Sequence, residues 1–368
     1  MNQPRSIVSA LAAVLLLGSA AGAAAEEIRI YNWSDYIDED ILKEFTAETG
    51  IQVVYDTFDT NELLETKLLT GSTGYDIVVP TATFLNRQIK AGVFQKIDKS
   101  KLPNIKNMWP EIQERVARYD PGNEYSVTYM WGTTGIGYNV AKVKEALPNA
   151  PVNSWALLLD PANAEALSKC GIMMLDSAED VLPSVMNYLG IDPPDFDPAK
   201  PENVEKAAEH VGKLAKSIRK FHSDEWRQAL ADGDICVALG YSGDVLQYKA
   251  AAEEAGKGVE LQYVIPKEGA QLWFDVFAVP ADAPNPEGAH KFLDYMMRPE
   301  VIAKATNYVQ YANANLASQQ FVDKDVMENP AVYPDADTLK RLFTVSTVED
   351  PQLQRLITRA WTKAKTGQ

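Results

Sequence analysis

Hydrophobic and polar residues in the first part of the chain follow two alternating periods, one typical of strands and one typical of helices. Strand-like runs span 28–33, 51–58 and 75–80, and helical patterns span 38–49, 61–70 and 84–91. The first helix is well marked, with Asp38 before its apolar face and Gly50 as its stop. Strands that alternate with helices in this way predict a parallel sheet flanked by helices.

A long β-rich run at 126–139 follows this first part. It contains Gly132, Gly135 and Gly137, but it lacks the third glycine and the helix start of a dinucleotide-binding fingerprint. Glycines in an extended segment indicate instead a crossing between domains, where another backbone or a ligand comes close.

The remaining pattern predicts a chain that leaves one α/β unit, builds a second and returns to the first. Helices are expected at 152–159, 181–189, 204–218, 224–231, 245–255, 286–297, 299–307 and from Pro351 onward, and strands at 234–241 and 274–280. The predicted fold class is α/β with two lobes, each a mixed sheet flanked by helices, and a ligand cleft at the hinge. We expect residues 26–133 and 277–308 to form the first lobe, and residues 138–272 and 313–368 to form the second.

The first 25 residues have the order of a secretory signal peptide. Arg5 supplies a positive charge, an apolar stretch runs from Ile7 to Leu17, and small residues lead up to Ala25. The stretch is too short to span a bilayer as a helix, and the acidic Glu26 that follows favours cleavage over an N-terminal core helix or a membrane anchor. Cleavage after about Ala25 would leave 368 − 25 = 343 residues in the periplasm, enough for two domains.

The net charge narrows the class of binding partner. The formal net charge of −16 becomes −17 without Arg5. A negative charge of this size disfavours nucleic acid and anionic membranes as partners and suits a cationic partner, although solubility alone would also account for it.

In an exported chain, Cys170 and Cys236 most simply form one disulfide, with two separate buried thiols as the alternative. The scattered histidines give no metal-site spacing, so we expect neither a metal nor a cofactor.

The sequence contains no GxSxG elbow, P-loop, HExxH motif or EF-hand loop, but aromatic residues next to acids recur where strands end. The recurring segments are Trp33-Ser34-Asp35-Tyr36, Tyr241-Ser242-Gly243-Asp244, Trp273-Phe274-Asp275 and Tyr311-Ala312-Asn313-Ala314-Asn315. Ligands of open α/β sheets bind outside the carboxyl ends of the strands, which makes these segments candidate site residues. Any one of the rings taken alone could equally belong to the core.

An aliphatic diamine would use this pairing of rings and acids. Each ammonium group needs a carboxylate, and a hydrogen bond to a charged group contributes about 1.5–3 kcal/mol. Ring faces provide flat walls for the methylene chain and add about 0.5–2 kcal/mol of cation–π attraction. Together these terms reach about −8 kcal/mol after association costs, which corresponds to a micromolar site. A sugar also uses rings with acids, so the residues alone predict a small polar ligand on aromatic platforms.

Several segments, in order and spacing, resemble the putrescine/spermidine-binding proteins of bacterial ABC transporters, which are periplasmic binding proteins. The similarity extends over essentially the whole mature chain and is carried by YNWSDYI, FDTNELLETKLLTGSTGYDIVVPTATFL, YMWGTTGIGYN, GDICVALGYSGDV, IPKEGA, FDVFAVP, YANAN and TRAWTK. The resemblance implies two lobes that close on a polyamine, and an inner-membrane ABC permease as the partner. We expect a monomer that is not an enzyme and does not insert into the membrane.

The resemblance also implies which residues bind the ligand. By position they are Trp33, Ser34, Asp35, Tyr36, Thr81, Thr83, Phe84, Asp180, Tyr241, Asp244, Trp273, Asp275 and Tyr311. In these roles Asp244 and Asp275 would bind one ammonium group, while Asp35 and Asp180 would serve the other end, directly or through water. The aromatic box would consist of Trp33, Tyr36, Tyr241, Trp273 and Tyr311. The family also has cysteines at the positions of Cys170 and Cys236.

Three positions depart from the putrescine-type pattern. Tyr241 stands where such members often carry Trp, Trp273 where they often carry Phe, and Asp180 where Glu is common. The larger ring at 273 favours the longer spermidine, whereas Asp35 and Thr83-Phe84 resemble the putrescine type, so the length of the ligand stays open. Two alternatives remain: a binding protein for another organic cation or a sugar, and a periplasmic hydrolase with paired carboxylates.

Overall fold

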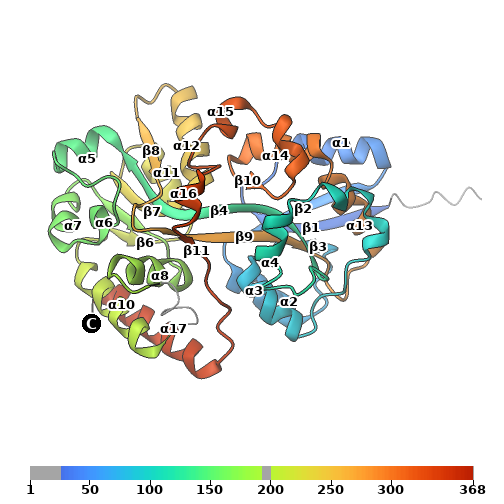
Figure 1. The fold of residues 1–368 in the computed structure, drawn as a ribbon, viewed down its shortest axis with the longest axis horizontal. Helices are drawn as coiled ribbons and strands as arrows, with labels where there is room; N and C mark the ends of the chain where they lie inside the picture. Colours follow the sequence, from blue (N-terminus) through green and yellow to red (C-terminus); the bar gives the residue numbers. More distant parts are fainter. Residues whose placement is uncertain (1–25, 193–199, 368) are drawn as a thin grey trace, which may run out of the picture.

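The computed structural model describes residues 26–192 and 200–367 as an α/β protein with one mixed sheet (Figure 1). The described strands are β1 (Glu27–Trp33), β2 (Gln52–Phe58), β3 (Ile77–Val78), β4 (Ser126–Asn139), β5 (Ile172–Met174), β6 (Lys220–Phe221), β7 (Val237–Tyr241), β8 (Leu261–Val264), β9 (Ala270–Ala278), β10 (Ala312–Asn313) and β11 (Leu342–Phe343). Their order is β2-β1-β3-β9-β4-β7-β5-β6, with β8 and β10 also paired with β4, and β11 with β9. The expected signal peptide at 1–25 lies outside the described residues.

Helices cover both faces of this sheet (Figure 1). Those described are α1 (Glu39–Thr49), α2 (Asn61–Thr70), α3 (Ala82–Lys90), α4 (Pro110–Val116), α5 (Val140–Ala146), α6 (Ala156–Leu159), α7 (Pro161–Leu167), α8 (Ala178–Tyr188), α10 (Pro201–Leu214), α11 (Trp226–Ala231), α12 (Ser242–Glu254), α13 (Pro286–Met296), α14 (Pro299–Val309), α15 (Lys324–Met327), α16 (Ala336–Leu339) and α17 (Pro351–Thr366). Helix α1 begins and ends as predicted, because Asp38 accepts a hydrogen bond from the Asp40 amide at 2.9 Å and Gly50 takes a φ of 75°.

The strand directions explain how one sheet serves two halves of the molecule. Strand β1 pairs in parallel with β2 and β3, as the alternating pattern predicted, and β5 pairs in parallel with β6 and β7. The long strands β4 and β9 run antiparallel to each other through the middle of the picture (Figure 1). They connect the two parallel groups, so the two expected sheets are joined into one hydrogen-bonded sheet.

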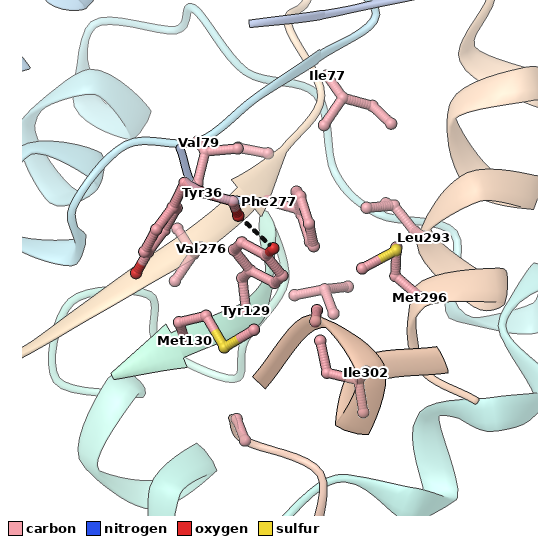
Figure 2. Close-up of a cluster of buried hydrophobic side chains, with 14 of the residues drawn as sticks. Tyr36, Ile77, Val79, Tyr129, Met130, Val276, Phe277, Leu293, Met296 and Ile302 are labelled. Atoms are coloured by element: carbon pink, nitrogen blue, oxygen red, sulfur yellow. Dashed lines mark hydrogen bonds between the residues drawn. The ribbon is translucent and has the colours of Figure 1, made fainter. Parts of the chain in front are cut away.

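Two hydrophobic clusters form on this shared sheet. The first contains buried residues of β1, β3, α1, α13 and α14, and the second contains those of β5, β7, α8, α10 and α11. The segment from Tyr311 to Val332 contributes to the first cluster, although the sequence boundaries placed residues from 313 onward in the second lobe. Figure 2 shows part of the first cluster, where the Tyr129 hydroxyl donates a 2.6 Å hydrogen bond to the Tyr36 carbonyl.

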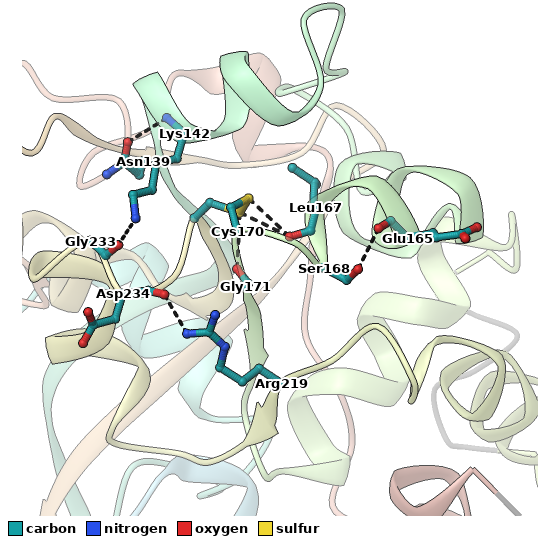
Figure 3. Close-up of a disulfide and its surroundings, with 11 residues drawn as sticks. Asn139, Lys142, Glu165, Leu167, Ser168, Cys170, Gly171, Arg219, Gly233 and Asp234 are labelled. Carbon is teal, nitrogen blue, oxygen red and sulfur yellow. Dashed lines mark hydrogen bonds between the residues drawn. A yellow bond between two sulfur atoms is a disulfide. The ribbon is translucent and has the colours of Figure 1, made fainter.

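A disulfide joins Cys170 and Cys236 in the second half, which confirms the predicted pairing (Figure 3). Cys170 lies just before β5 and Cys236 just before β7. The loop that leads into β7 is also held by Arg219, whose Nη1 donates to the Asp234 carbonyl at 2.6 Å. Together the cross-link and this bond fix the start of a strand whose last residue, Tyr241, reaches the candidate site.

Within residues 26–192 and 200–367, no helix is long and apolar enough to cross a bilayer.

Candidate functional site

A cavity of about 950 Å³, counting the solvent-connected space at its mouth, lies among elements of both hydrophobic clusters. Twelve of the thirteen residues predicted for the site line it. They are Trp33, Ser34, Tyr36, Thr81, Thr83, Phe84, Asp180, Tyr241, Asp244, Trp273, Asp275 and Tyr311. Trp33 and Trp273 therefore share one cavity with Asp244 and Asp275, as the predicted binding of a ligand between aromatic rings and carboxylates requires.

The ends of strands bring these side chains together. Trp33 ends β1 and Thr81 follows β3, which is parallel to β1. Tyr241 ends β7, which runs in the opposite direction because β3, β9, β4 and β7 pair antiparallel in turn. The carboxyl ends of the two parallel groups therefore meet at the cavity. Asp275 lies within β9 and forms an isolated antiparallel bridge with Thr81. The sheet thus positions the site, and the loops after the strands need to extend only a short way to place their side chains in the cavity.

Asp275 is the most enclosed carboxylate of the cavity, with 5% of its surface exposed. The Tyr36 hydroxyl donates to Asp275 Oδ2 at 2.9 Å, and the Thr81 hydroxyl donates to Oδ1 at 2.8 Å. Burial raises the pKa of Asp275 to about 7; the two hydroxyl donors oppose the shift, and the charges of Asp180 and Asp244 add to it. A buried carboxylate of this kind gains most from a cationic ligand.

The Thr81 side chain forms a hydrogen bond with Asp275 instead of capping the helix that it precedes. It occupies the N-cap position of α3 without a side-chain capping hydrogen bond. Its hydroxyl donates to Asp275 instead, and it accepts a 2.9 Å hydrogen bond from Asn61 Nδ2. Because a capping hydrogen bond is worth about 1 kcal/mol, its absence here favours a role in the site over a purely structural one.

Asp180 and Asp244 provide two further carboxylates on the second half of the molecule. Asp180 accepts hydrogen bonds from the Tyr241 hydroxyl at 3.0 Å and the Thr134 hydroxyl at 3.2 Å. Asp244, in the first turn of α12, accepts a 2.7 Å hydrogen bond from the Tyr311 hydroxyl. Removal from water is the main cause that raises the pKa of each carboxyl.

A continuous set of rings forms one wall of the cavity. Trp273 contacts Tyr241 and Tyr311 with centroid distances of 5.7 and 5.2 Å, and Tyr311 contacts Tyr36 at 5.5 Å, all with steeply inclined planes. The backbone of Gly132 allows this packing, since a Cβ atom there would lie 2.6 Å from the Trp273 ring. The sequence predicted that another backbone or a ligand comes close to the β4 glycines. At Gly132 the close neighbour is a side chain instead, whereas a Cβ atom at Gly135 would lie 2.6 Å from the backbone carbonyl oxygen of Val264.

Asp35 is the predicted residue that does not line the cavity. Its φ of 55° lies in the left-handed region, where Asp is tolerated, and its side chain is exposed. The turn directs Trp33, Ser34 and Tyr36 to the cavity while Asp35 lies at the surface. Its carbonyl accepts a 3.3 Å hydrogen bond from Gln247 Nε2 of α12.

Sequence reasoning missed several other lining residues. They are Phe58, Asp59, Thr60, Asn61, Glu62, Asp176, Ser177, Glu179, Ser223, Asp224, Arg227 and Gln271. Gln271 could have been found, because strand periodicity places it on the same face of β9 as Trp273 and Asp275. No sequence motif indicated Arg227, because its sequence context is that of an ordinary residue in a short helix.

One ion pair connects the two clusters at the cavity. Arg87 of α3 forms two hydrogen bonds with Glu65 of α2, at 2.6 and 2.9 Å, and its Nη1 lies 3.5 Å from Glu179 Oε1 of α8. Burial raises the pKa of Glu179 to about 7, with Arg87 opposing the shift and Glu62 adding to it. This contact can stabilise the arrangement in which the two halves enclose the cavity.

We expect Glu179→Gln to accelerate ligand release about threefold, because a partly exposed ion pair contributes about 0.2–1 kcal/mol. Stopped-flow tryptophan fluorescence would measure the release rate. Glu65→Gln is the matched control, since it removes a partner of the same Arg87 without touching the contact between the halves. Equal release rates for the wild type and the Glu179 variant would contradict the role of this pair.

The chain matches the family model of the bacterial extracellular solute-binding proteins over residues 40–334. The chain belongs to this family. It is 51% identical to the putrescine-binding periplasmic protein PotF of Escherichia coli, with 98% of each chain covered. It is 48% identical to the putrescine-binding periplasmic protein SpuD of Pseudomonas aeruginosa, with 97% of this chain and 98% of the relative covered.

A solved structure is also similar across nearly its full length. The spermidine/putrescine ABC transporter substrate-binding protein PotD of Streptococcus pneumoniae superposes with a TM-score of 0.76 at 32% identity, covering 93% of this chain and 99% of that one. The predicted two-lobed binding-protein fold is therefore confirmed. Because the family consists of solute-binding transport proteins, this member is a binding protein and not an enzyme.

Proposed function

We propose that this solute-binding protein captures an aliphatic polyamine in the periplasm and delivers it to an inner-membrane ABC permease. Putrescine and spermidine are the candidate ligands, as the names of PotF, SpuD and PotD state for those relatives. The exported form would begin near Glu26, after removal of the 25-residue leader. It would act as a monomer, with the ligand enclosed between the two halves.

One observation carries this proposal. Asp180 and Asp275 line the same cavity, and each has a hydroxyl donor on both carboxylate oxygens. Within the described part of the chain, neither carboxylate forms an ion pair with a cationic side chain. Two ammonium groups would supply the missing positive charges, and the ring wall would cover the methylene chain between them.

Gln271 gives independent support. It is buried in the cavity wall, and its Oε1 has no hydrogen-bond donor among the described residues. A buried acceptor without a donor costs about 1–3 kcal/mol. An ammonium group carries three N–H donors, more than its carboxylate partner needs, and could satisfy this amide oxygen as well.

The assignment of residues to lobes follows from the clusters. We propose that the first lobe contains 26–133, 277–308 and the segment from Tyr311 to Val332, and that the second contains 138–272 and the C-terminal residues that pack on it. Helix α17 supports the second part of this assignment, because Trp361 and Ala364 belong to the second cluster. The strands β4 and β9 would then form the hinge.

Thermal unfolding of the ligand-free protein tests the proposal. We expect saturating putrescine or spermidine to raise the melting temperature by several degrees, since ligand at 100 times Kd stabilises the folded state by about 2.7 kcal/mol. 1,4-Butanediol is the matched control, with the same carbon chain and no charge, and it should give no shift. The proposal fails if neither polyamine shifts the transition.

The same assay separates the two alternatives. A sugar or another organic cation that shifts the transition, with no effect of either polyamine, would indicate a different ligand class. Mass analysis of the incubated ligand addresses the hydrolase alternative, because a binding protein returns its ligand unchanged.

A further inference from the structure

Two hydrogen bonds join Asn61 and Thr81 in the wall of the cavity. Asn61 is the first residue of α2, and Thr81 directly precedes α3. The Thr81 amide N–H donates to Asn61 Oδ1 at 3.0 Å, and Asn61 Nδ2 donates to Thr81 Oγ1 at 2.9 Å. A backbone N–H can only donate, so the oxygen of the Asn61 amide must face it, and the NH₂ group must face the Thr81 hydroxyl.

This arrangement determines the direction of the Thr81 hydroxyl. Because Oγ1 accepts from Asn61 and a hydroxyl has a single hydrogen, that hydrogen is directed to Asp275 Oδ1, 2.8 Å away. Tyr36 bonds the other carboxylate oxygen at 2.9 Å, and its hydroxyl forms no further hydrogen bond within the described part of the chain. The Tyr36 hydroxyl can therefore reverse and accept a proton from a neutral Asp275, whereas the Thr81 hydroxyl can only donate.

We propose that Asn61 is a positioning residue that holds the Thr81 hydroxyl as a donor and so favours the ionised form of Asp275, the form that binds a cation. This inference rests on the proposed polyamine-binding function and adds a residue that acts through Thr81 rather than on the ligand. A donor of fixed direction stabilises a carboxylate more than a neutral carboxyl group. Without Asn61, the Thr81 hydroxyl could turn and accept the proton of a neutral Asp275, and the preference for the ionised form would be lost.

The titratable groups around Asp275 do not provide this preference. Burial raises the pKa of Asp275 to about 7, and the charges of Asp180 and Asp244 add to the rise. The Arg227 guanidinium pairs with Asp224 and lies beside Asp244 instead. Burial, together with the charge of Asp275, raises the pKa of three tyrosines, which therefore stay neutral: Tyr36, Tyr129 and Tyr241. The two hydroxyl donors to Asp275 are what oppose the rise, and Thr81 is the one whose direction is fixed.

Asn61→Asp tests the inference, because it replaces the NH₂ donor with an acceptor in a side chain of the same shape. An acid in the first turn also suits a helix, so the fold should be kept. The Thr81 hydroxyl would then donate to the new carboxylate, and Asp275 would lose its donor. The pH below which putrescine affinity falls should therefore rise by about one unit. In isothermal titration calorimetry, the variant should bind putrescine about tenfold more weakly than the wild type at pH 6, and within about threefold of it at pH 8.5.

Further variants separate the hydrogen bond from the added charge. Asn149→Asp makes the same charge change at an exposed position outside the cavity and should leave the pH dependence unchanged. In a Thr81→Val background the hydroxyl is absent, so Asn61→Asp should move the pH dependence by about half as much or less. The neutral Asn61→Ala removes both hydrogen bonds and should move the pH dependence in the same direction as Asn61→Asp. It replaces the charged variant if melting curves show that the latter is unfolded.

The titration of Asp275 can also be followed without ligand, through carboxyl ¹³C chemical shifts, with Asp275→Asn to assign the signal. The pKa of Asp275 should be about one unit higher in Asn61→Asp than in the wild type. A change of less than about 0.3 unit in both Asn61 variants overturns the inference. An equal loss of affinity at every pH also overturns it, since that result indicates a purely structural role. If the wild type binds no polyamine, the proposed function fails, and the ligand-free titration still decides the role of Asn61.

Discussion

Replacing Asp275 with Asn is expected to weaken polyamine binding at least a hundredfold. Removing one partner of a desolvated, hydrogen-bonded charge pair costs about 2–5 kcal/mol, and a hundredfold loss corresponds to about 2.7 kcal/mol. Asp275 should reach this range because it is 5% exposed and has no cationic partner in the described protein. Asn keeps the shape of the side chain and one acceptor oxygen, so the variant tests the contribution of the negative charge alone. Isothermal titration calorimetry would measure the change.

The stability of the same variant separates a lost interaction from a damaged fold. Without ligand, Asp275→Asn should be at least as stable as the wild type at pH 7, since it removes an uncompensated buried charge. Asp325→Asn, which makes the same charge change at an exposed position, should bind normally. A loss of less than about fivefold in the Asp275 variant would show that this carboxylate is not a principal ligand contact.

Local signals in the sequence were enough to predict the elements that carry the site. The β-rich run predicted at 126–139 is strand β4, and the caps of α1 and α17 lie where Asp38, Gly50 and Asp350 indicated. Helix α6 is shorter than predicted because distant residues decide its start. There Glu268 accepts hydrogen bonds from the Ser154 hydroxyl and the Trp155 amide, which holds the chain ahead of Ala156 in a turn.

The candidate site was predictable to the extent that chain order determines it. Ligands of open α/β sheets bind at the carboxyl ends of strands, which indicated Trp33 and Tyr241 without knowledge of the fold, whereas Thr81 was implied by the family resemblance. Chain order did not show that β7 runs opposite to β1 and β3. The side chain of Asp35 could not be placed, because it depends on a positive φ inside a short turn. The contact of Arg227 with Asp244 joins α11 to α12 through space and leaves no spacing signal in the sequence.

The titration of Asp275 should make the ligand-free protein less stable as the pH rises from about 4 to about 7. The pKa of this carboxyl is raised from 3.8 to about 7 in the folded protein. Between these values the folded state binds more protons than the unfolded state, so the free energy of unfolding falls with rising pH. Three units correspond to about 4 kcal/mol. Chemical denaturation across this range should show the fall, and Asp275→Asn should lack this part of it, while Glu179 titrates in both proteins.

Titration of the same carboxyl should have the opposite effect on ligand affinity, which is expected to rise with pH. A polyamine keeps its ammonium groups charged below pH 8, and it binds the ionised form of Asp275, so affinity should fall about tenfold for each pH unit below about 7 and level off above it. Calorimetry in buffers of different ionisation enthalpy would then detect proton release on binding near pH 7, and the Asp275→Asn variant should release fewer protons. A constant Kd between about pH 5.5 and 7.5 would mean that Asp275 is already ionised before the ligand arrives, and that burial alone does not hold its proton.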